Sequence, residues 1–385
     1  MKLEEKTIKL LIAGDYFIAD NFKEQSLIDT SIKEVFNKSD FNIINLESPV
    51  TKNNHKNRIL KTGPHLRSDE ESSIPQLKQL NIDLVTLSNN HIMDYGSKGL
   101  EDTLQILNKH DIQYVGAGKN KEDAAKIYSA KSNGVKIAIL NYTESEWSVA
   151  HDLSAGANPL DLIDNIKQIQ FAKQNHDKVI VIIHGGHEYY SLPSPRMVKQ
   201  YRFYADNGAD IIIGHHPHCI GGYEIHNNVP IFYSLGNFLF TMQSENDDWY
   251  QGIILELVIE SNKPIEFLAI PISQDREKFT LSLAGEAEKE MVLDKLRSSS
   301  QIILDSEKLE QHWQKFVEES MDKSIYTFSP FNYFKIRIFR SIVFRLKIYK
   351  LFINESYLSN ILNKIRCEAH YDLIISALKH KITSR

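Results

Sequence analysis

Five apolar segments of this chain end in side chains that can bind a metal ion. In the densest example, 208–218, an apolar strand pattern opens onto His215, His216 and His218. The other segments, each given with the polar residues that follow it, are 10–13 with Asp15, 43–46 with Glu47, 84–87 with Asn90 and His91, and 179–183 with His184. The carboxyl ends of parallel strands meet at one edge of a sheet. The pattern therefore predicts a fold that assembles one site along such an edge.

Strand-like and helix-like segments alternate over most of the chain. The predicted strands are 8–14, 42–46, 83–88, 111–115, 135–140, 179–183 and 210–213. The predicted helices are 26–36, 71–80, 97–109, 159–175 and 195–207, with Asp161 or Asn158 as the cap of the fourth. Hairpins are expected around 132–134, 227–228 and 261–263. This order predicts an α/β fold with mixed sheets covered by helices.

Length and composition limit the class of protein. A chain of 385 residues can form one large α/β domain with a smaller appendage, and its net charge of −5 favours no particular partner. Cys219 and Cys367 are the only cysteines, which excludes a disulfide scaffold and fits a reducing compartment. We find neither a secretory leader pattern nor an apolar run of membrane-spanning length. The expected location is the cytoplasm.

The sequence pattern changes near residue 285. Residues 1–284 carry every candidate ligand, whereas 285–385 is predicted to be a helical extension. Within the extension, 326–353 is aromatic and basic, with six Lys or Arg and no acidic residue. An apolar stripe of Phe339, Ile342, Val343 and Leu346 either packs on the main domain or attaches to an anionic membrane at the inner face. Nucleic acid is not expected, because no recognition motif accompanies the charge.

The candidate ligands combine carboxylate oxygen, imidazole nitrogen and amide oxygen. Asp15 and Glu47 offer anionic oxygens, and a carboxylate can bridge two cations. Alone, Asp15 is more often a turn residue and His184 a core histidine, so the hypothesis depends on the whole set. That set suits one or two divalent ions, namely Mn, Fe or Zn, because mixed N and O ligands discriminate poorly among them. His91 could protonate a leaving oxygen or stabilise transition-state charge.

The order of these motifs resembles the CapA-type capsule and poly-γ-glutamate synthesis proteins, a branch of the calcineurin-like metallophosphoesterases. The matching motifs lie within 8–272 and are Gly14-Asp15, Asn45-Leu46-Glu47-Ser48-Pro49, Ser88-Asn89-Asn90-His91 with Asp94-Tyr95-Gly96, His184-Gly185-Gly186-His187-Glu188-Tyr189, Gly214-His215-His216-Pro217-His218 and Tyr233-Ser234-Leu235-Gly236-Asn237-Phe238. The resemblance implies a four-layer sandwich with two mixed β-sheets flanked by helices.

The resemblance also implies roles for individual residues. One metal would be held by Asp15, Glu47 and His218, and the other by Glu47, Asn90, His184 and His216. Residues that would support the ligands or face the substrate are Asp94, His187, Glu188, Tyr189, His215 and Asn237. Two departures stand out, because the superfamily has a histidine where this chain has Phe17 and usually an aspartate where it has Glu47.

Two classes of function follow. The first is a metal-dependent hydrolase or transferase in the biosynthesis of capsule or another surface polymer, acting on a phosphorylated or amide-linked precursor. The second is a non-catalytic assembly component that retains the metal site. His91, next to Asn90, favours the enzyme class. Phe17 and Glu47, which depart from the superfamily pattern, are compatible with the non-catalytic assembly class.

Overall fold

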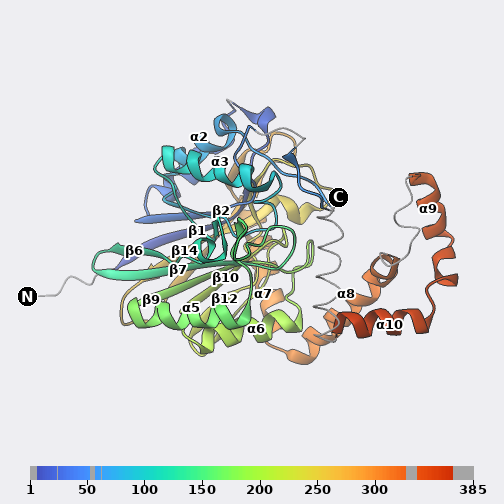
Figure 1. Cartoon of the computed structure of the whole chain (residues 1–385). Helices are drawn as coiled ribbons and strands as arrows, with labels where there is room; N and C mark the ends of the chain where they lie inside the picture. The colour runs from blue at the N-terminus through green and yellow to red at the C-terminus, as the bar shows by residue number, and fades with distance from the viewer. Residues whose placement is uncertain (1–6, 24, 53–56, 62, 327–335, 367–385) are drawn as a thin grey trace, which may run out of the picture. The chain divides into compact units, whose positions relative to one another are not determined.

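The computed structural model describes residues 7–23, 25–52, 57–61, 63–326 and 336–366. The chain divides into two compact units, Met1–Glu310 and Gln311–Arg385. The first unit contains two main sheets (Figure 1). The residues of the predicted site belong to this unit.

The first sheet joins the N-terminal strands to strands from the end of the unit. Its described strands run in the order β16 (Leu281–Leu283), β15 (Glu266–Gln274), β14 (Gln251–Ile259), β1 (Ile8–Phe17), β2 (Phe41–Leu46), β3 (Leu84–Thr86) and β4 (Gln113–Val115), with β13 (Asn237–Phe240) also paired with β1. Strands β1 to β4 are mutually parallel, whereas β14 is antiparallel to β1. The sheet is therefore mixed.

The second sheet is also mixed. Its described strands run in the order β11 (Tyr223–His226), β12 (Val229–Phe232), β10 (Ile211–His215), β9 (Lys178–His184), β7 (Val135–Thr143) and β6 (Tyr128–Ser132). The four inner strands are parallel, and the two edge strands are antiparallel hairpin partners. A separate short pair joins β5 (Ala117–Gly118) to β8 (Gly156–Ala157).

Alternation along the strands produces four layers, because successive side chains point to opposite faces of a sheet. Leu10 and Ile12 of β1 share a buried core with Ile180 and Ile182 of β9, so two sheet faces pack on each other. The outer face of the first sheet packs against α1 (Thr30–Phe36), α2 (Glu70–Gln79) and α3 (Gly96–Lys109). The outer face of the second packs against α5 (Leu162–Asn175) and α6 (Pro195–Asp206).

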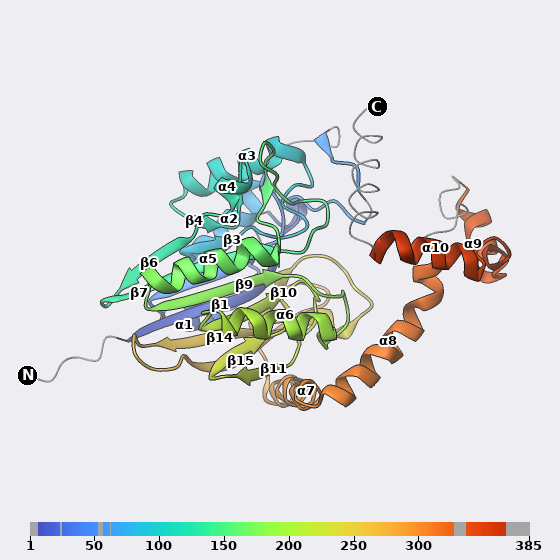
Figure 2. The same ribbon diagram turned by 60° about the horizontal axis from the view of Figure 1, so that its bottom comes forward.

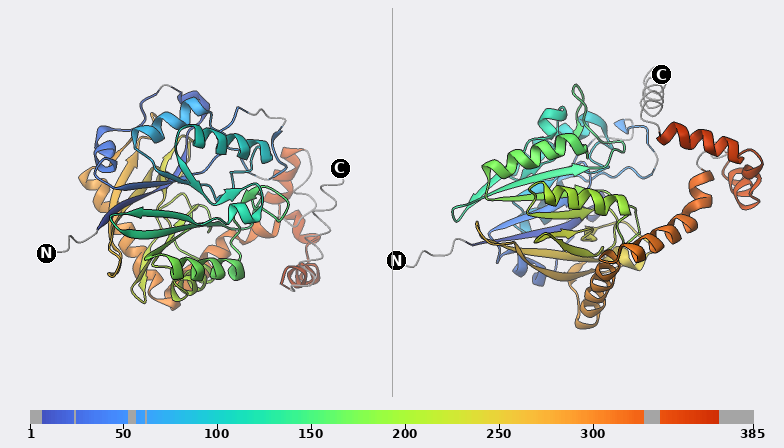
Figure 3. Two further views of the ribbon diagram at one scale, coloured as in Figure 1. Left: turned by 60° about the vertical axis from the view of Figure 1, so that its left-hand side comes forward. Right: turned by 90° about the horizontal axis from the view of Figure 1, so that it is seen from below.

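The figures show the same layering. Figure 2 shows α5 and α6 lying across the strands of the second sheet, and Figure 3 shows both sheets between the blue-to-cyan and the green helices. The predicted fold class, a four-layer arrangement of two mixed sheets flanked by helices, is confirmed.

Local sequence signals explain several element boundaries. The Asp161 side chain accepts hydrogen bonds from the backbone N–H groups of Ile163 and Asp164, as its predicted capping role requires. The three predicted hairpins appear as β6–β7, β11–β12 and β14–β15. The helix predicted for 26–36 is shorter and begins at Thr30, because Asp29 caps it by accepting from the Ser31 N–H. Strand β13 is absent from the sequence prediction.

Two glycines allow β13 to lie directly beside β1. A Cβ atom on Gly14 would lie 2.0 Å from the Gly236 carbonyl oxygen, so no larger residue fits there without a shift. Gly236 itself has φ +71°, in the left-handed region that favours glycine. The register of β1 shifts at Asp15 relative to both β2 and β13. Such bulges re-aim side chains, and here the bulge falls at the first candidate ligand.

The segment after residue 285 is helical. Helix α7 (Glu286–Ile303) packs against β11 and β15 within the first unit. Helices α8 (Ser306–Tyr326), α9 (Arg337–Arg345) and α10 (Glu355–Arg366) follow. None of the described helices is long and apolar enough to cross a membrane. Residues 327–335 of the basic segment and 367–385 at the end of the predicted helical extension lie outside the described residues.

We predict that Gly14→Ala destabilises the first unit by about 2–3 kcal/mol, because the added methyl group must displace the backbone of Gly236. Thermal unfolding should show a lower midpoint than wild type. Gly285→Ala is the matched control, since its Cβ would meet nothing closer than the Glu288 carboxylate at 4.0 Å. Equal midpoints for Gly14→Ala and Gly285→Ala would contradict this account of the β1–β13 contact.

Candidate metal centre

The ends of strands from both sheets converge on one buried cluster. Asp15 lies at the bulge of β1 and Glu47 directly follows β2. From the second sheet, His184 is the last residue of β9, and His216 and His218 follow β10. All five side chains are buried. The strand-end pattern in the sequence thus corresponds to one location in the folded unit.

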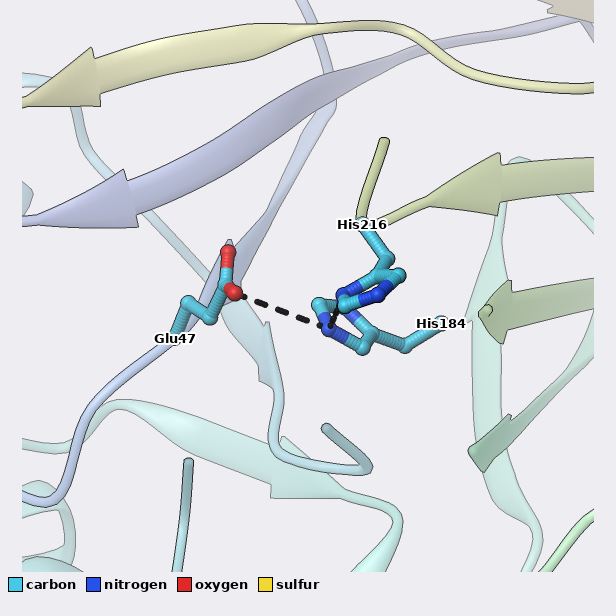
Figure 4. Close-up of side chains that lie close together, drawn as sticks. All are labelled: Glu47, His184 and His216. Atoms are coloured by element: carbon cyan, nitrogen blue, oxygen red, sulfur yellow. Dashed lines mark hydrogen bonds and ion pairs between the residues drawn. The ribbon is translucent and has the colours of Figure 1, made fainter. Parts of the chain in front are cut away.

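The cluster consists of two groups that share one carboxylate. Glu47, His184 and His216 form the first group, and Asp15, Glu47 and His218 form the second. Within each group, the atoms that could bind a metal lie within 4.8 Å of one another. Figure 4 shows the Glu47 carboxylate directed toward a nitrogen of the His184 ring, and the His216 ring lies beside the same nitrogen. A carboxylate in this position can bridge two cations.

Glu47 is the most poorly satisfied polar group in this cluster. Neither of its carboxylate oxygens has a hydrogen-bond partner among the described residues, although both are buried. Its Oε1 lies 3.6 Å from His184 Nε2 and 3.7 Å from His218 Nε2. Burial, followed by repulsion from Asp15 and Glu188, raises the pKa of Glu47 well above its usual value. A buried anion needs a compensating charge, and a divalent cation fits this position.

The imidazoles of the cluster favour their neutral form, which is the form that binds metals. Burial lowers the pKa of His216 to about 4 and that of His218 to about 3. Burial lowers the pKa of His184 well below its usual value, and the neighbouring histidines add to the effect. Burial also raises the pKa of Asp15 to about 7. The buried histidines of the cluster therefore carry free ring-nitrogen lone pairs that could bind a metal ion.

Asparagine side chains orient two of the candidate ligands. Asn237 Nδ2 donates to the Trp249 carbonyl, which directs its Oδ1 to His218 Nδ1 at 2.9 Å. His218 Nδ1 must therefore donate, leaving the Nε2 lone pair for a metal. Asn45 Nδ2 donates to Asp15 Oδ1 over 2.7 Å and lies 3.2 Å from His184 Nδ1. Asn45 thus connects ligand candidates from the two sheets.

The loop after β10 adopts a restricted backbone conformation. His216 has φ +101° and His218 has φ +54°, values that non-glycine residues seldom adopt. The backbone N–H of His216 donates to Asp15 Oδ2 over 3.2 Å, which holds the loop against β1. Strained residues persist where surrounding contacts hold them, and they cluster at functional sites.

Asn90 and Glu146 border the group formed by Glu47, His184 and His216. Asn90 Oδ1 lies 3.1 Å from His184 Nε2, and its Nδ2 donates to Glu146 Oε2 over 3.4 Å. Glu146 Oε1 lies 4.0 Å from His216 Nε2, although its side chain is 42% exposed. The predicted amide ligand is therefore beside the predicted histidines.

His91 belongs to a buried network of three residues. Its Nδ1 lies 2.7 Å from Asp94 Oδ2, and an ionised carboxylate can only accept a hydrogen bond, so Nδ1 donates. Lys61 forms an ion pair with Asp94 Oδ1, and its Nζ lies 3.1 Å from His91 Nδ1. The Lys61 side chain is only 2% exposed. The network leaves His91 Nε2 as the ring atom that can exchange a proton.

The other predicted supporting residues occupy different positions. His215 is fully buried, and Asp15 Oδ1 lies 3.5 Å from its Nδ1, although neither ring nitrogen of His215 forms a hydrogen bond with the described residues. Tyr189 is 47% exposed with φ +62°, and its ring stacks on Trp249. His187 is partly buried and Glu188 is exposed. The latter three residues lie on the segment after β9, which ends at His184.

An aromatic cluster occupies the side of the site near Phe17. The Phe17 ring packs on Phe240, with centroids 5.2 Å apart, and Phe240 packs on His218 and Trp249. Trp249 also lies against His218, with centroids 4.6 Å apart. Aromatic rings of Phe240 and Trp249 therefore pack against His218.

The sequence prediction missed Lys61, Glu146 and Trp249 and assigned no separate role to Asn45. A polar residue inside the apolar run of β2 was a usable signal for Asn45. Lys61 and Trp249 carried no comparable signal, since neither follows an apolar strand pattern directly.

Comparisons with known proteins identify related sequences. The family model described as "Bacterial capsule synthesis protein PGA_cap" matches residues 9–242. "Capsule biosynthesis protein CapA" of Bacillus anthracis is 34% identical over 252 residues, which cover 62% of this chain and 61% of that protein. "PGA biosynthesis protein CapA" of Bacillus subtilis (strain 168) is 40% identical over 213 residues, covering 54% and 55%. The matched part thus spans less than two thirds of either relative's length.

A solved structure with limited similarity is that of 5'-nucleotidase from Candida albicans SC5314. It aligns with a TM-score of 0.41 at 12% identity, covering 77% of this chain and 58% of the nucleotidase chain.

We predict that purified protein contains a divalent transition metal and that His184→Ala and His216→Ala each lower its metal content. Elemental analysis should show a loss in both variants, because each removes a nitrogen from the group that shares Glu47. His226→Ala is the matched control, since His226 contacts Asp206 at the surface and lies outside both groups. Undiminished metal in both site variants would rule out the site.

Proposed function

The chain belongs to the bacterial capsule synthesis protein family PGA_cap, and from this premise we propose that it is a metal-dependent hydrolase or related transferase. Its substrate would be a phosphorylated or amide-linked precursor of a capsule, poly-γ-glutamate or a related surface polymer. The metal centre at the strand ends would be the reaction site.

The observation that carries this proposal is the position of Glu47. A carboxylate with two unsatisfied oxygens, shared between two groups of metal-binding atoms, is costly to bury in a protein that binds no cation. Glu47, His184, His216 and Asn90 would hold one ion, and Asp15, Glu47 and His218 the other. Such mixed nitrogen and oxygen donors suit Mn, Fe or Zn.

A divalent ion held there would act as a Lewis acid on a phosphoryl or carbonyl oxygen and make water a better nucleophile at neutral pH. The protein's own residues would bind and orient the substrate and move protons. Burial lowers the pKa of His91, while its hydrogen bond to Asp94 opposes that effect. His91 Nε2 would exchange a proton with the attacking or leaving oxygen.

Lys61 would act through Asp94 as a positioning residue. Its ammonium group pairs with the buried Asp94 carboxylate, which also accepts a hydrogen bond from the Leu66 N–H over 2.7 Å. These contacts hold the Asp94 carboxylate in place, with its Oδ2 directed to His91 Nδ1. The His91 ring is thereby fixed in one orientation and one tautomer.

The alternative is a non-catalytic assembly component that keeps the metal site. The observation in its favour is the aromatic packing of Phe17, which leaves the group of Asp15, Glu47 and His218 with few donors. An assembly protein would not need the buried network of Lys61, His91 and Asp94, so the two proposals differ in what that network does.

We predict that His91→Ala lowers turnover by roughly 10²–10⁴-fold, the usual contribution of a general acid or base. The assay would use phosphomonoester, phosphodiester and γ-glutamyl amide substrates, with metal content and thermal midpoint measured in parallel. Metal content should stay at the wild-type level, because His91 belongs to neither metal-binding group. Full complementation of polymer production by a folded, metal-loaded His91→Ala protein would instead favour the assembly role.

We predict that Lys61→Met lowers kcat with little change in KM, because Asp94 then loses the cation that holds it in place. Lys61→Arg should recover part of kcat by restoring the charge. Lys98→Met is the matched control, since Lys98 is 56% exposed and pairs with Glu101 on the surface of α3. An equal kcat in the Lys61→Met and Lys98→Met proteins would show that Lys61 does not position Asp94 for the reaction.

A further inference from the structure

Helix α9 presents an exposed apolar arc. Ile338, Ile342 and Leu346 follow one another at intervals of four residues, so they lie on one side of the helix. Their side chains are 73%, 46% and 67% exposed, and the neighbouring Phe339 is 39% exposed. Large apolar side chains that are contiguous and exposed mark an interaction surface more often than a solvated one.

A different face of α9 is buried in a small hydrophobic core. Val343 is buried in a small core with Tyr349 and Ile353, and Phe344 and Leu358 pack against that core. The sequence predicts one stripe that includes Val343 with Phe339, Ile342 and Leu346. The structure divides that stripe, because Val343 is buried and the other three remain exposed. Among the described residues, Ile338, Ile342 and Leu346 are therefore not part of that small core.

Basic residues accompany the exposed arc. The described segment 336–353 contains five basic residues and no acidic residue, the basic residues being Arg337, Arg340, Arg345, Lys347 and Lys350. The turn that follows α9 adds two further exposed apolar side chains, Leu351 at 80% and Phe352 at 57%. A short helix with an apolar face and basic polar positions is typical of segments that lie in the interface of an anionic bilayer.

We propose that the segment 337–352, formed by α9 and the turn after it, binds the surface of an anionic phospholipid bilayer. The exposed apolar arc enters the interfacial region, and the basic residues contact the lipid phosphates. Basic residues alone would be compatible with nucleic acid, and an exposed apolar face alone would be compatible with a groove on a protein. The combination of the two is typical of a segment that binds an anionic lipid surface. This proposal is independent of the reaction proposed for the metal centre.

Co-sedimentation of the full-length protein with vesicles tests the proposal. Binding should require phosphatidylglycerol, be weak on pure phosphatidylcholine vesicles, and decrease as salt increases. Replacing Arg337, Arg340 and Arg345 together by Gln should weaken binding on the order of 100-fold, since each basic residue contributes roughly fivefold. The matched control replaces Lys289, Lys308 and Lys315 of α7 and α8 by Gln, and its binding should equal that of wild type.

A second variant distinguishes insertion from simple charge attraction. Replacing Ile338, Ile342 and Leu346 by Ser should weaken binding at least tenfold even at low salt, with circular dichroism confirming that the protein stays folded. The proposal is overturned if the wild-type protein does not co-sediment with anionic vesicles at low salt. It is also overturned if the serine variant binds as wild type does, or if the lysine control loses as much binding as the arginine variant.

Discussion

The structure of the site depends on one electrostatic constraint, the burial of the Glu47 carboxylate without a hydrogen-bond donor for either oxygen. Removing a charge from water costs several kcal/mol unless a compensating charge or donor replaces the lost hydration. The nearest groups are His184 and His218, whose nitrogens lie more than 3.5 Å from Glu47 Oε1 and whose pKa values are lowered by burial. A shared divalent centre, as proposed here, would remove this cost and would account for the two groups of donors around one carboxylate.

The two-sheet architecture creates that constraint. Parallel strands of both sheets end in the same region, so carboxylates from β1 and β2 face histidines from β9 and β10. The contact between Gly14 and Gly236 lets β13 lie directly against β1, and Asn237 at the start of β13 orients His218. Backbone packing and ligand geometry are therefore coupled at one position.

Much of this arrangement could be predicted from the sequence. Apolar runs that end in ligand residues indicated the strand ends, and Asn-Asn and Ser-Asn-Lys turns indicated the hairpins. The side chains predicted for each of the two ions lie together in the structure, while their role as ligands stays a prediction. The division at residue 284 into a catalytic domain and an extension also stays a prediction.

The features that could not be predicted depend on long-range contacts. Strand β13 pairs with β1 across more than 200 residues, and its four residues carry no periodicity that would identify the partner. Lys61 comes from an irregular segment and reaches Asp94 only because the chain around Ile59 and Leu66 is hydrogen-bonded to Asp94. Trp249 packs on His218 from a short 3₁₀ turn, Asp247–Tyr250. Such contacts are set by the assembled fold and not by local pattern.

The central claim is that Glu47 bridges two divalent ions between the sheets. Anomalous X-ray diffraction from crystals grown with Mn²⁺ tests it directly, because the ions and the carboxylate are then located together. The account predicts two anomalous peaks about 3.5–4 Å apart, one on each side of the Glu47 carboxylate. Crystals with Mn²⁺ present but no anomalous peak within bonding distance of Glu47 would contradict the account.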